Sequence, residues 1–161
     1  MFKSRRVSAA GLVTSKLFDE KAFYQAFEHD AKKAKHTVTI ESPFMTERRA
    51  LQFVKTFNKL KKRGVKVRVN TRNPRHHDKL LEIQCWKAMR TLREVGVKVC
   101  TYDDMRHRKL AIIDKQILWE GSLNILSQGN SREIMRRTES PQMCKQVAAF
   151  TKVDSRFRWY N

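Results

Sequence analysis

Hydrophobic residues recur every three or four positions in four segments of the chain, the spacing that places them on one face of an α-helix. The pattern predicts helices over residues 19–34, 46–63, 78–95 and 141–157. Asp19 and Asp78 are suited to cap the first and third of these helices. The apolar positions expected to face a core include Phe53, Phe57, Leu92, Leu51, Leu80, Ile83, Trp86, Cys144 and Phe150.

Shorter segments between these helices have alternating apolar and polar residues or are rich in β-branched residues, as in β-strands. Strands are predicted over residues 36–42, 65–70, 97–102, 109–113, 116–120 and 133–137. In the 65–70 segment the valines face one way and the basic residues the other. The dipeptide Asp114-Lys115 is short enough to join its two neighbouring strands as a hairpin.

The order of these elements predicts an α/β fold. Helices and strands alternate through the first two-thirds of the chain, which favours parallel strands with helices on both faces of the sheet. The later hairpin adds antiparallel strands, so the central sheet should be mixed and largely parallel. The 161 residues suffice for one domain, assigned to residues 18–161, after a basic arm or edge segment at residues 1–17.

The charge of the chain narrows the choice of partners. There are 35 Lys and Arg against 16 Asp and Glu, a formal net charge of +19. Such an excess attracts polyanions by releasing their condensed counterions. Nucleic acid is the favoured partner, with DNA preferred over RNA, and an anionic membrane surface is second. A charge that only keeps the protein in solution is the alternative explanation.

Several other protein classes are disfavoured by what the sequence lacks. No apolar stretch approaches the roughly 20 residues of a membrane-spanning helix, so we expect a cytoplasmic protein without integral membrane contact. Neither a GxGxxG nor a GxxxxGK(S/T) loop is present, which argues against dinucleotide enzymes and nucleotide-driven motors. The three cysteines lack zinc-site spacing, and His76, His77 and Asp78 fit a polar loop before a helix better than a metal site. We therefore expect neither a metal ion nor a cofactor.

One stretch carries a pattern suited to phosphate chemistry. With its spacing it reads H-x-K-x4-D-x6-G-S-x-N, formed by His107, Lys109, Asp114, Gly121, Ser122 and Asn124. Residues two apart in an extended strand share a face, so His107 and Lys109 should point the same way. An imidazole beside an ammonium group forms an anion site that contains a nucleophile. Gly121 allows close backbone approach, and Ser122 and Asn124 can donate hydrogen bonds to phosphate oxygens.

This pattern resembles the HKD signature of the phospholipase D superfamily with its GSxN extension, and every defining position is present. The resemblance implies an α/β/α sandwich and metal-independent phosphodiester transfer. It implies that His107 attacks phosphorus and forms a phosphohistidine. Lys109 and Asn124, supported by Ser122, would then stabilise the charged transition state.

The resemblance also implies that Glu133 orients the histidine and that Asp114 organises the site rather than transferring protons. The sequence contains only one such motif, because no other histidine is followed by x-K-x4-D. Single-motif members of the superfamily dimerise so that two motifs meet, and the histidine of the second motif protonates the leaving oxygen. We therefore expect a homodimer with one composite site.

Substrate should lie beyond the carboxyl ends of the parallel strands, as in other α/β sheets. The loops that follow the predicted strands 36–42 and 65–70 should therefore form the rim of the substrate pocket. The residues expected to bind substrate there or beside the nucleophile are Ser42, Arg72, Arg75, His76, Arg106 and Arg108. Such side chains could follow a phosphate backbone without reading the bases.

These observations predict a metal-independent phosphodiesterase, and the charge favours an endonuclease acting on DNA or RNA. Since the superfamily also includes enzymes that act on phospholipids, a phosphatidyl hydrolase is the second hypothesis. A nucleic-acid-binding module with the family fold is the third. Small single-motif members often work beside other proteins, so a helicase or restriction partner remains open.

Overall fold

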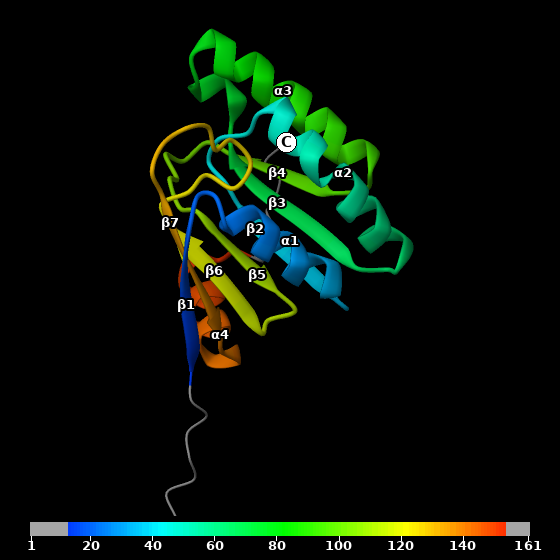
Figure 1. Ribbon diagram of the computed structural model, residues 1–161. Coiled ribbons are helices and arrows are strands. Elements are labelled where there is room, and N and C mark those ends of the chain that lie inside the picture. The colour runs from blue at the N-terminus through cyan, green and yellow to red at the C-terminus, as the bar shows by residue number, and fades with distance from the viewer. Residues whose placement is uncertain (1–12, 154–161) are drawn as a thin grey trace, which may run out of the picture.

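A seven-stranded mixed sheet forms the centre of the computed structural model, which describes residues 13–153 (Figure 1). The strand order is β1-β7-β6-β5-β2-β3-β4. The strands are β1 (Thr14–Asp19), β2 (Thr37–Glu41), β3 (Lys66–Arg72), β4 (Lys98–Tyr102), β5 (Leu110–Ile113), β6 (Ile117–Gly121) and β7 (Ile134–Glu139). The helices are α1 (Phe23–Lys33), α2 (Glu47–Lys62), α3 (Lys79–Glu94) and α4 (Pro141–Thr151), with a 3₁₀ turn, η1, at Pro74–His76.

The sheet has a parallel and an antiparallel part. β2, β3 and β4 are parallel neighbours, connected through α2 and α3. β5 pairs antiparallel with β2, and β6, β7 and β1 continue antiparallel to the far edge. The predicted α/β class and mixed sheet are confirmed. The sheet is not largely parallel as predicted, because two of its six strand pairings within residues 13–153 are parallel and four are antiparallel, β1 having joined the antiparallel side through β7. The last residues of the segment predicted as a basic arm or edge belong to β1, which lies at the edge of the sheet. Residues 1–12 of that segment lie outside the described part.

Local side chains set where the helices begin. Thr46, Asp78 and Ser140 each accept a hydrogen bond from a backbone amide in the first turn of α2, α3 and α4. These caps give partners to amides that have none within the helix. α1 begins only at Phe23, later than predicted, because the Asp19 carboxylate caps a turn ahead of the helix. None of the helices within residues 13–153 is long and apolar enough to cross a membrane.

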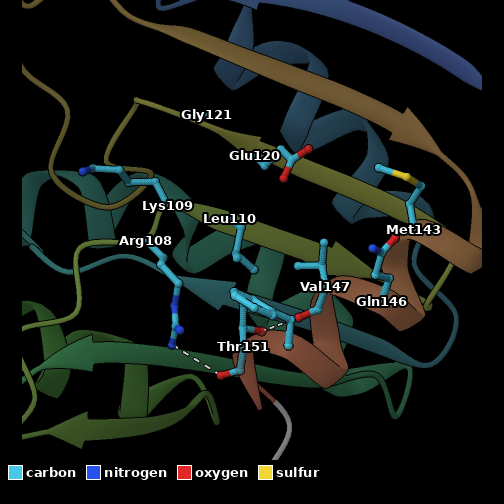
Figure 2. Close-up of a pocket in the computed structure, with 10 residues that line it drawn as sticks. Arg108, Lys109, Leu110, Glu120, Gly121, Met143, Gln146, Val147 and Thr151 are labelled. Carbon is cyan, nitrogen blue, oxygen red and sulfur yellow. Dashed lines mark hydrogen bonds between the residues drawn. The ribbon is translucent and has the colours of Figure 1, made fainter.

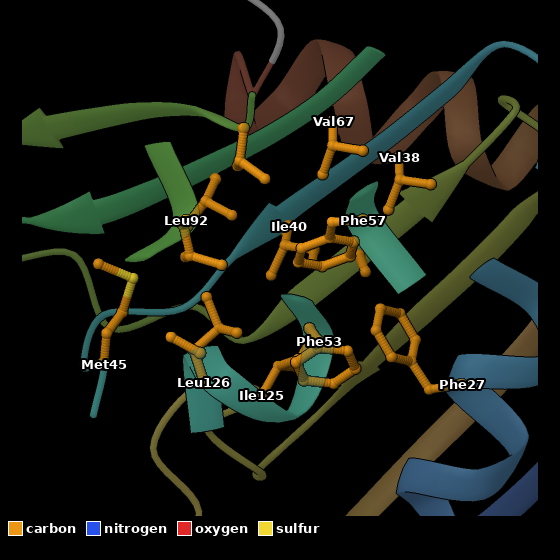
Figure 3. Packing of buried hydrophobic residues seen from close by; sticks show 14 of the residues in the cluster. Phe27, Val38, Ile40, Met45, Phe53, Phe57, Val67, Leu92, Ile125 and Leu126 are labelled. Carbon is orange, nitrogen blue, oxygen red and sulfur yellow. The ribbon is translucent and has the colours of Figure 1, made fainter. Parts of the chain in front are cut away.

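The larger core lies between one face of the sheet and helices α1, α2 and α3 (Figure 3). Aromatic rings fill much of it, and Phe27, Phe53 and Trp119 are at most 1% exposed. The ring nitrogen of Trp119 donates to the buried carboxylate of Asp30 at 2.9 Å. Arg137 of β7 pairs with the same carboxylate at 2.7 Å.

A smaller core lies under α4 on the opposite face of the sheet. It consists of Leu110, Ile112, Leu118, Cys144 and Val153. Helices on both faces give the α/β/α layers that the sequence and the resemblance predicted. α4 ends at Thr151, and the rest of the segment predicted as helix lies largely outside the described residues.

Several apolar residues that the helical periodicity predicts to be buried are exposed in the structure. They are 43–84% exposed and comprise Leu51, Leu80, Ile83, Trp86 and Phe150. α3 shows the physical reason. It packs on α2 and on β4 at the edge of the sheet, and its buried residues are Cys85, Ala88, Met89 and Leu92. A helix at a sheet edge buries a narrower stripe than its hydrophobic periodicity allows.

Candidate active site

His107 and Lys109 lie side by side where the chain enters β5. The ammonium nitrogen of Lys109 is 2.7 Å from Nδ1 of His107 and donates a hydrogen bond to the His107 carbonyl at 2.9 Å. β5 begins one residue later, at Leu110, so both side chains leave the same side of the approaching chain. The structure thus brings together the imidazole and the ammonium group that the sequence places two residues apart.

Positive charge surrounds this imidazole. Partial burial lowers the pKa of His107 below its usual value of 6.5, and the charges of Lys109 and Arg72 lower it further. The ring is therefore neutral at pH 7 and able to act as a nucleophile. Burial also lowers the pKa of Lys109, although the carboxylate of Glu133 acts in the opposite direction.

An aromatic side chain borders the site on the side of β2. Phe44 lies edge-on to His107, with ring centroids 5.6 Å apart, and its centroid is 5.1 Å from that of His77. The Arg72 guanidinium is 5.1 Å from the Phe44 centroid, within cation–π range. Ser42 is buried beneath this loop, and its hydroxyl donates to the Phe44 carbonyl at 2.9 Å. The sequence predicts this loop at the rim of the site but no role for Phe44. The position of Phe44 directly after a strand is the signal that points to it.

The GSxN segment forms the turn that leaves β6. A methyl group at Gly121 would lie 2.1 Å from the Ile134 carbonyl oxygen, so the two backbones approach too closely for any other residue. Ser122 bonds to Ile134 twice: its amide donates to the carbonyl at 3.0 Å, and its hydroxyl accepts from the amide at 3.1 Å. The Asn124 side-chain oxygen is buried without a hydrogen-bond partner among residues 13–153. This oxygen is an acceptor and cannot bind a phosphate oxygen, so the role of the Asn124 amide nitrogen as a donor stays a prediction.

Glu133 lies on the Lys109 side of the pair, directly before β7. Its carboxylate accepts a hydrogen bond from the Ser131 hydroxyl at 2.8 Å, and its amide donates to Glu20 at 3.1 Å. Its charge acts on Lys109. Its part in orienting His107 therefore stays a prediction.

Asp114 lies at the opposite end of β5 from His107. Its carboxylate accepts hydrogen bonds from the backbone amides of Lys35, His36 and Thr37 at 2.8, 2.8 and 2.9 Å. Burial acts to raise the pKa of this carboxyl, but the three amides outweigh burial and lower it. Asp114 therefore fixes the hairpin to the start of β2, and it organises the fold at a distance from the nucleophile.

The loop after β3 carries Arg75, His76, His77 and Asp78. Arg75 and His76 are exposed at the rim, where a substrate could reach them. Asp78 caps α3 by accepting from the Leu81 amide at 3.0 Å, as its sequence context predicted. In the part of the chain that the structure describes, no group of three or more His, Cys, Asp or Glu side chains is placed to hold a metal ion.

Three arginines expected to bind substrate are engaged within the protein. Arg72 is 8% exposed and donates to the Arg106 carbonyl at 3.0 Å. Arg106 forms two hydrogen bonds with Asp104, at 2.6 and 2.7 Å, and lies 3.7 Å from Glu41. Arg108 donates to the same Glu41 carboxylate at 2.8 Å. Internal carboxylates hold both Arg106 and Arg108, and their contact with substrate phosphates stays a prediction.

A hollow of about 580 Å³ opens beside Lys109, between the β5–β6 hairpin and α4 (Figure 2). Its wall is largely apolar and includes Leu110 of β5 with Met143, Val147 and Phe150 of α4. No sequence pattern indicates this hollow, because it forms between a strand and a helix that are distant along the chain.

A family model described as "Cardiolipin synthase, PLD-like domain" matches residues 27–158, a range that includes His107, Lys109, Asn124 and Glu133. The chain belongs to the phospholipase D-like family. The match spans most of the sequence, so the resemblance indicated by the HKD pattern is confirmed. No curated protein matches this phospholipase D-like sequence at a significant level.

Several solved structures share this phospholipase D-like fold at low sequence identity. Nuc from Salmonella typhimurium, described as a phospholipase D family member, has a TM-score of 0.71 at 18% identity, over 86% of this chain and 91% of that chain. NucT from Helicobacter pylori has a TM-score of 0.67 at 18% identity, over 87% and 94%. A phosphatidylserine synthase from Haemophilus influenzae has a TM-score of 0.62 at 15% identity, over 92% of this chain and 39% of that chain. At these identities the likeness shows the fold.

Proposed function

We propose that this phospholipase D-like protein is a metal-independent phosphodiesterase that cleaves nucleic acid as an endonuclease. The observation that carries the proposal is the contact between His107 and Lys109. It joins a neutral nucleophile to a cation that can neutralise a phosphate oxygen. Asn124 and Ser122, on the adjoining turn, are the further donors that the family resemblance supplies.

The proposed reaction has two steps. A nitrogen of neutral His107 attacks phosphorus, and the P–N bond forms as the bond to the leaving oxygen breaks. The leaving oxygen takes a proton from a second imidazole. The proposal requires the two imidazoles of the composite site to share a single proton, so that one is neutral and attacks while the other is protonated. Water then attacks the phosphohistidine, gives a proton to that second imidazole and releases His107. In both steps Lys109 offsets the charge that develops on the non-bridging oxygens.

A second copy of the chain supplies the second imidazole in this proposal. The sequence contains one HKD motif, and the mechanism needs two histidines. The fold aligns with 91% of Nuc and 94% of NucT, so one copy of this chain corresponds to nearly the whole of each chain. A homodimer that joins the two sites across a twofold axis fits these observations.

Nucleic acid is the substrate class that the charge favours, with DNA preferred over RNA. The net charge of +19 suits a polyanion better than a single headgroup. Arg75 and His76 are exposed at the rim and are the residues best placed to follow a phosphate backbone. With Ser42, Arg72, Arg106 and Arg108 engaged internally, contact with the backbone would be limited near the nucleophile.

A phospholipid hydrolase is the second candidate. The description of the matching family model, which names cardiolipin synthase, favours it. The apolar hollow adds no support, because it lies on the α4 face of the sheet with Arg108 and Leu110, opposite the side on which His107 leaves the chain. A module that binds nucleic acid without cleaving it is the third candidate.

One experiment separates these candidates. Labelled single- and double-stranded DNA, RNA and phospholipid vesicles are incubated with the protein in excess EDTA, alongside His107→Ala and the matched control His29→Ala on α1. We expect nucleic-acid cleavage that survives EDTA and is lost only in His107→Ala. Vesicle hydrolysis with the same dependence would select the lipid enzyme. Tight, salt-sensitive binding without cleavage would select a binding module, or an enzyme that needs a helicase or restriction partner. Equal cleavage by wild type and His107→Ala would overturn the proposed site.

A further inference from the structure

Glu41, the last residue of β2, is a fully buried carboxylate on the face of the sheet opposite the larger core. Its Oε1 accepts a hydrogen bond from Arg108 Nε at 2.8 Å and lies 3.7 Å from Arg106 Nη1. Its Oε2 has no hydrogen-bond partner among residues 13–153. Burying a carboxylate is unfavourable unless cations compensate for lost hydration, so these two arginines hold the position of Glu41 and are held by it.

The two arginines are the immediate chain neighbours of His107. Side chains alternate along an extended segment, so residues 106 and 108 leave the chain on the side opposite residue 107. Glu41 therefore contacts this segment on the side opposite His107, and the His107 side chain faces the site. Arg108 also donates to the Thr151 carbonyl at the end of α4, at 3.3 Å. The histidine is thus fixed through contacts with β2 and α4.

These contacts matter because regular structure does not hold the segment. Residues 105–109 lie between β4 and β5 and belong to no strand or helix. The Lys109 carbonyl accepts a single long hydrogen bond, from the Gly121 amide at 3.3 Å. Side chains therefore supply much of what fixes the backbone on either side of the proposed nucleophile. Arg108 binds Glu41, and Arg72 and Lys109 donate to the carbonyls of Arg106 and His107 at 3.0 and 2.9 Å.

From this geometry we infer that Glu41 is a positioning residue that fixes His107 chiefly through Arg108, which it binds at 2.8 Å. Arg106 adds a longer contact at 3.7 Å and is itself held by two hydrogen bonds to Asp104. The inference deepens the proposed function, because the positioned group is the proposed nucleophile. It also gives Arg106 and Arg108 an internal role in place of the substrate contact expected from the sequence.

The direct test is Glu41→Gln, which keeps the shape of the side chain and removes its charge. A misplacement of about 1 Å can cost on the order of a hundredfold in rate, so we expect kcat to fall by roughly 10- to 100-fold. KM should change by less than about threefold, because binding contacts are untouched. The matched control is Asp30→Asn, which neutralises a carboxylate that is 6% exposed and pairs with Arg137 on the other face of the sheet. It should leave kcat unchanged. An unchanged kcat in Glu41→Gln would overturn the inference.

Arg108→Gln distinguishes positioning from phosphate contact. If Arg108 acts through Glu41, this variant lowers kcat as Glu41→Gln does, and the double variant is no worse than the poorer single variant. Binding of an uncleaved oligonucleotide, measured in the His107→Ala background, should keep its affinity and salt dependence. A loss of affinity with a salt slope reduced by about one would instead show a phosphate contact, and would overturn the role assigned to Arg108.

A readout without catalysis keeps this inference separate from the proposed function. Hydrogen exchange followed by mass spectrometry should show faster exchange of residues 103–109 in Glu41→Gln and no change there in Asp30→Asn. If no substrate is ever cleaved, this comparison alone decides: faster exchange in Glu41→Gln supports the inference, and equal exchange overturns it. If Glu41→Gln does not fold, Arg108→Gln carries the same comparison, because its side chain is already 38% exposed.

Discussion

The ammonium nitrogen of Lys109 lies 2.7 Å from Nδ1 of His107, close enough for the charge state of one to control that of the other. A cation at this distance disfavours the imidazolium form. Lys109, which would bind phosphate in the proposed reaction, therefore also favours the unprotonated form of the proposed nucleophile. Lys109 would thus both bind phosphate and lower the pKa of His107, and the two effects can be measured separately.

Lys109→Gln should raise the pKa of His107, because it removes the positive charge that, after burial, contributes most to lowering it. The measurement is an NMR titration of the His107 ring in both proteins. The midpoint should move to higher pH in Lys109→Gln and stay in place in Lys55→Gln, an exposed lysine on α2. A midpoint that stays or falls in Lys109→Gln would contradict the electrostatic coupling.

Asp114→Asn should lower the free energy of unfolding by about 1–3 kcal/mol at pH 7, since one amide of the β2 start would face a donor instead of an acceptor. The folded-state pKa of Asp114 is lowered below its usual 3.8, so its contribution is present above that value. It is lost as the pH falls through the lower, folded-state pKa. Urea unfolding at pH 7 and in strong acid should therefore show a difference between the two proteins that shrinks in acid.

If Asp114 acts only on the fold, the folded Asp114→Asn protein should keep most of its cleavage activity. A large loss of kcat without loss of stability would instead place Asp114 in the chemistry. The same assay that tests His107→Ala provides this comparison.

Gly121→Ala should be strongly destabilising, because its methyl group would meet the Ile134 carbonyl oxygen at 2.1 Å and push β6 away from β7. Forced overpacking of this kind costs about 1–3 kcal/mol. Gly129→Ala is the matched control, since a methyl group there meets nothing within 4 Å. Thermal unfolding should show a clear loss for the first variant and little change for the second. Equal stability of the two would mean that the strands can separate freely.

Truncating leucines on α3 should reveal which face the helix buries. Leu92→Ala removes a fully buried side chain and should cost about 2–5 kcal/mol. Leu80 is 73% exposed, so Leu80→Ala should change stability by less than about 0.5 kcal/mol. Denaturant unfolding of both variants gives the comparison, and similar losses would show that Leu80 is covered in solution.

The sequence was most informative where a pattern is local. The alternation in β3 put Val67 and Val69 on the larger core, where both are buried, and the HKD spacing pointed to the contact of His107 with Lys109. These features depend on residues one or two positions apart, for which strand geometry decides which side chains meet.

The sequence was least informative where contacts between distant segments determine the position of a side chain. Glu41 and Arg108 are 67 positions apart, and no spacing rule connects a carboxylate on one strand with an arginine before another. The exposure of Leu80 depends on α3 lying at the sheet edge, which its own periodicity cannot show. The hollow under Phe150 likewise exists only once α4 has docked on β5 and β6.

The spacing within the HKD motif can be understood as a measure of strand length. The four residues between Lys109 and Asp114 are the whole of β5, Leu110–Ile113. They span the sheet from the nucleophile to the hairpin that Asp114 ties to β2. Ala111 and Ile113 face the larger core and Leu110 and Ile112 the smaller one, so a one-residue insertion or deletion would exchange the two faces. The interval of four residues is thus a requirement of the sheet, which holds the proposed nucleophile at one end of β5 and Asp114 at the other.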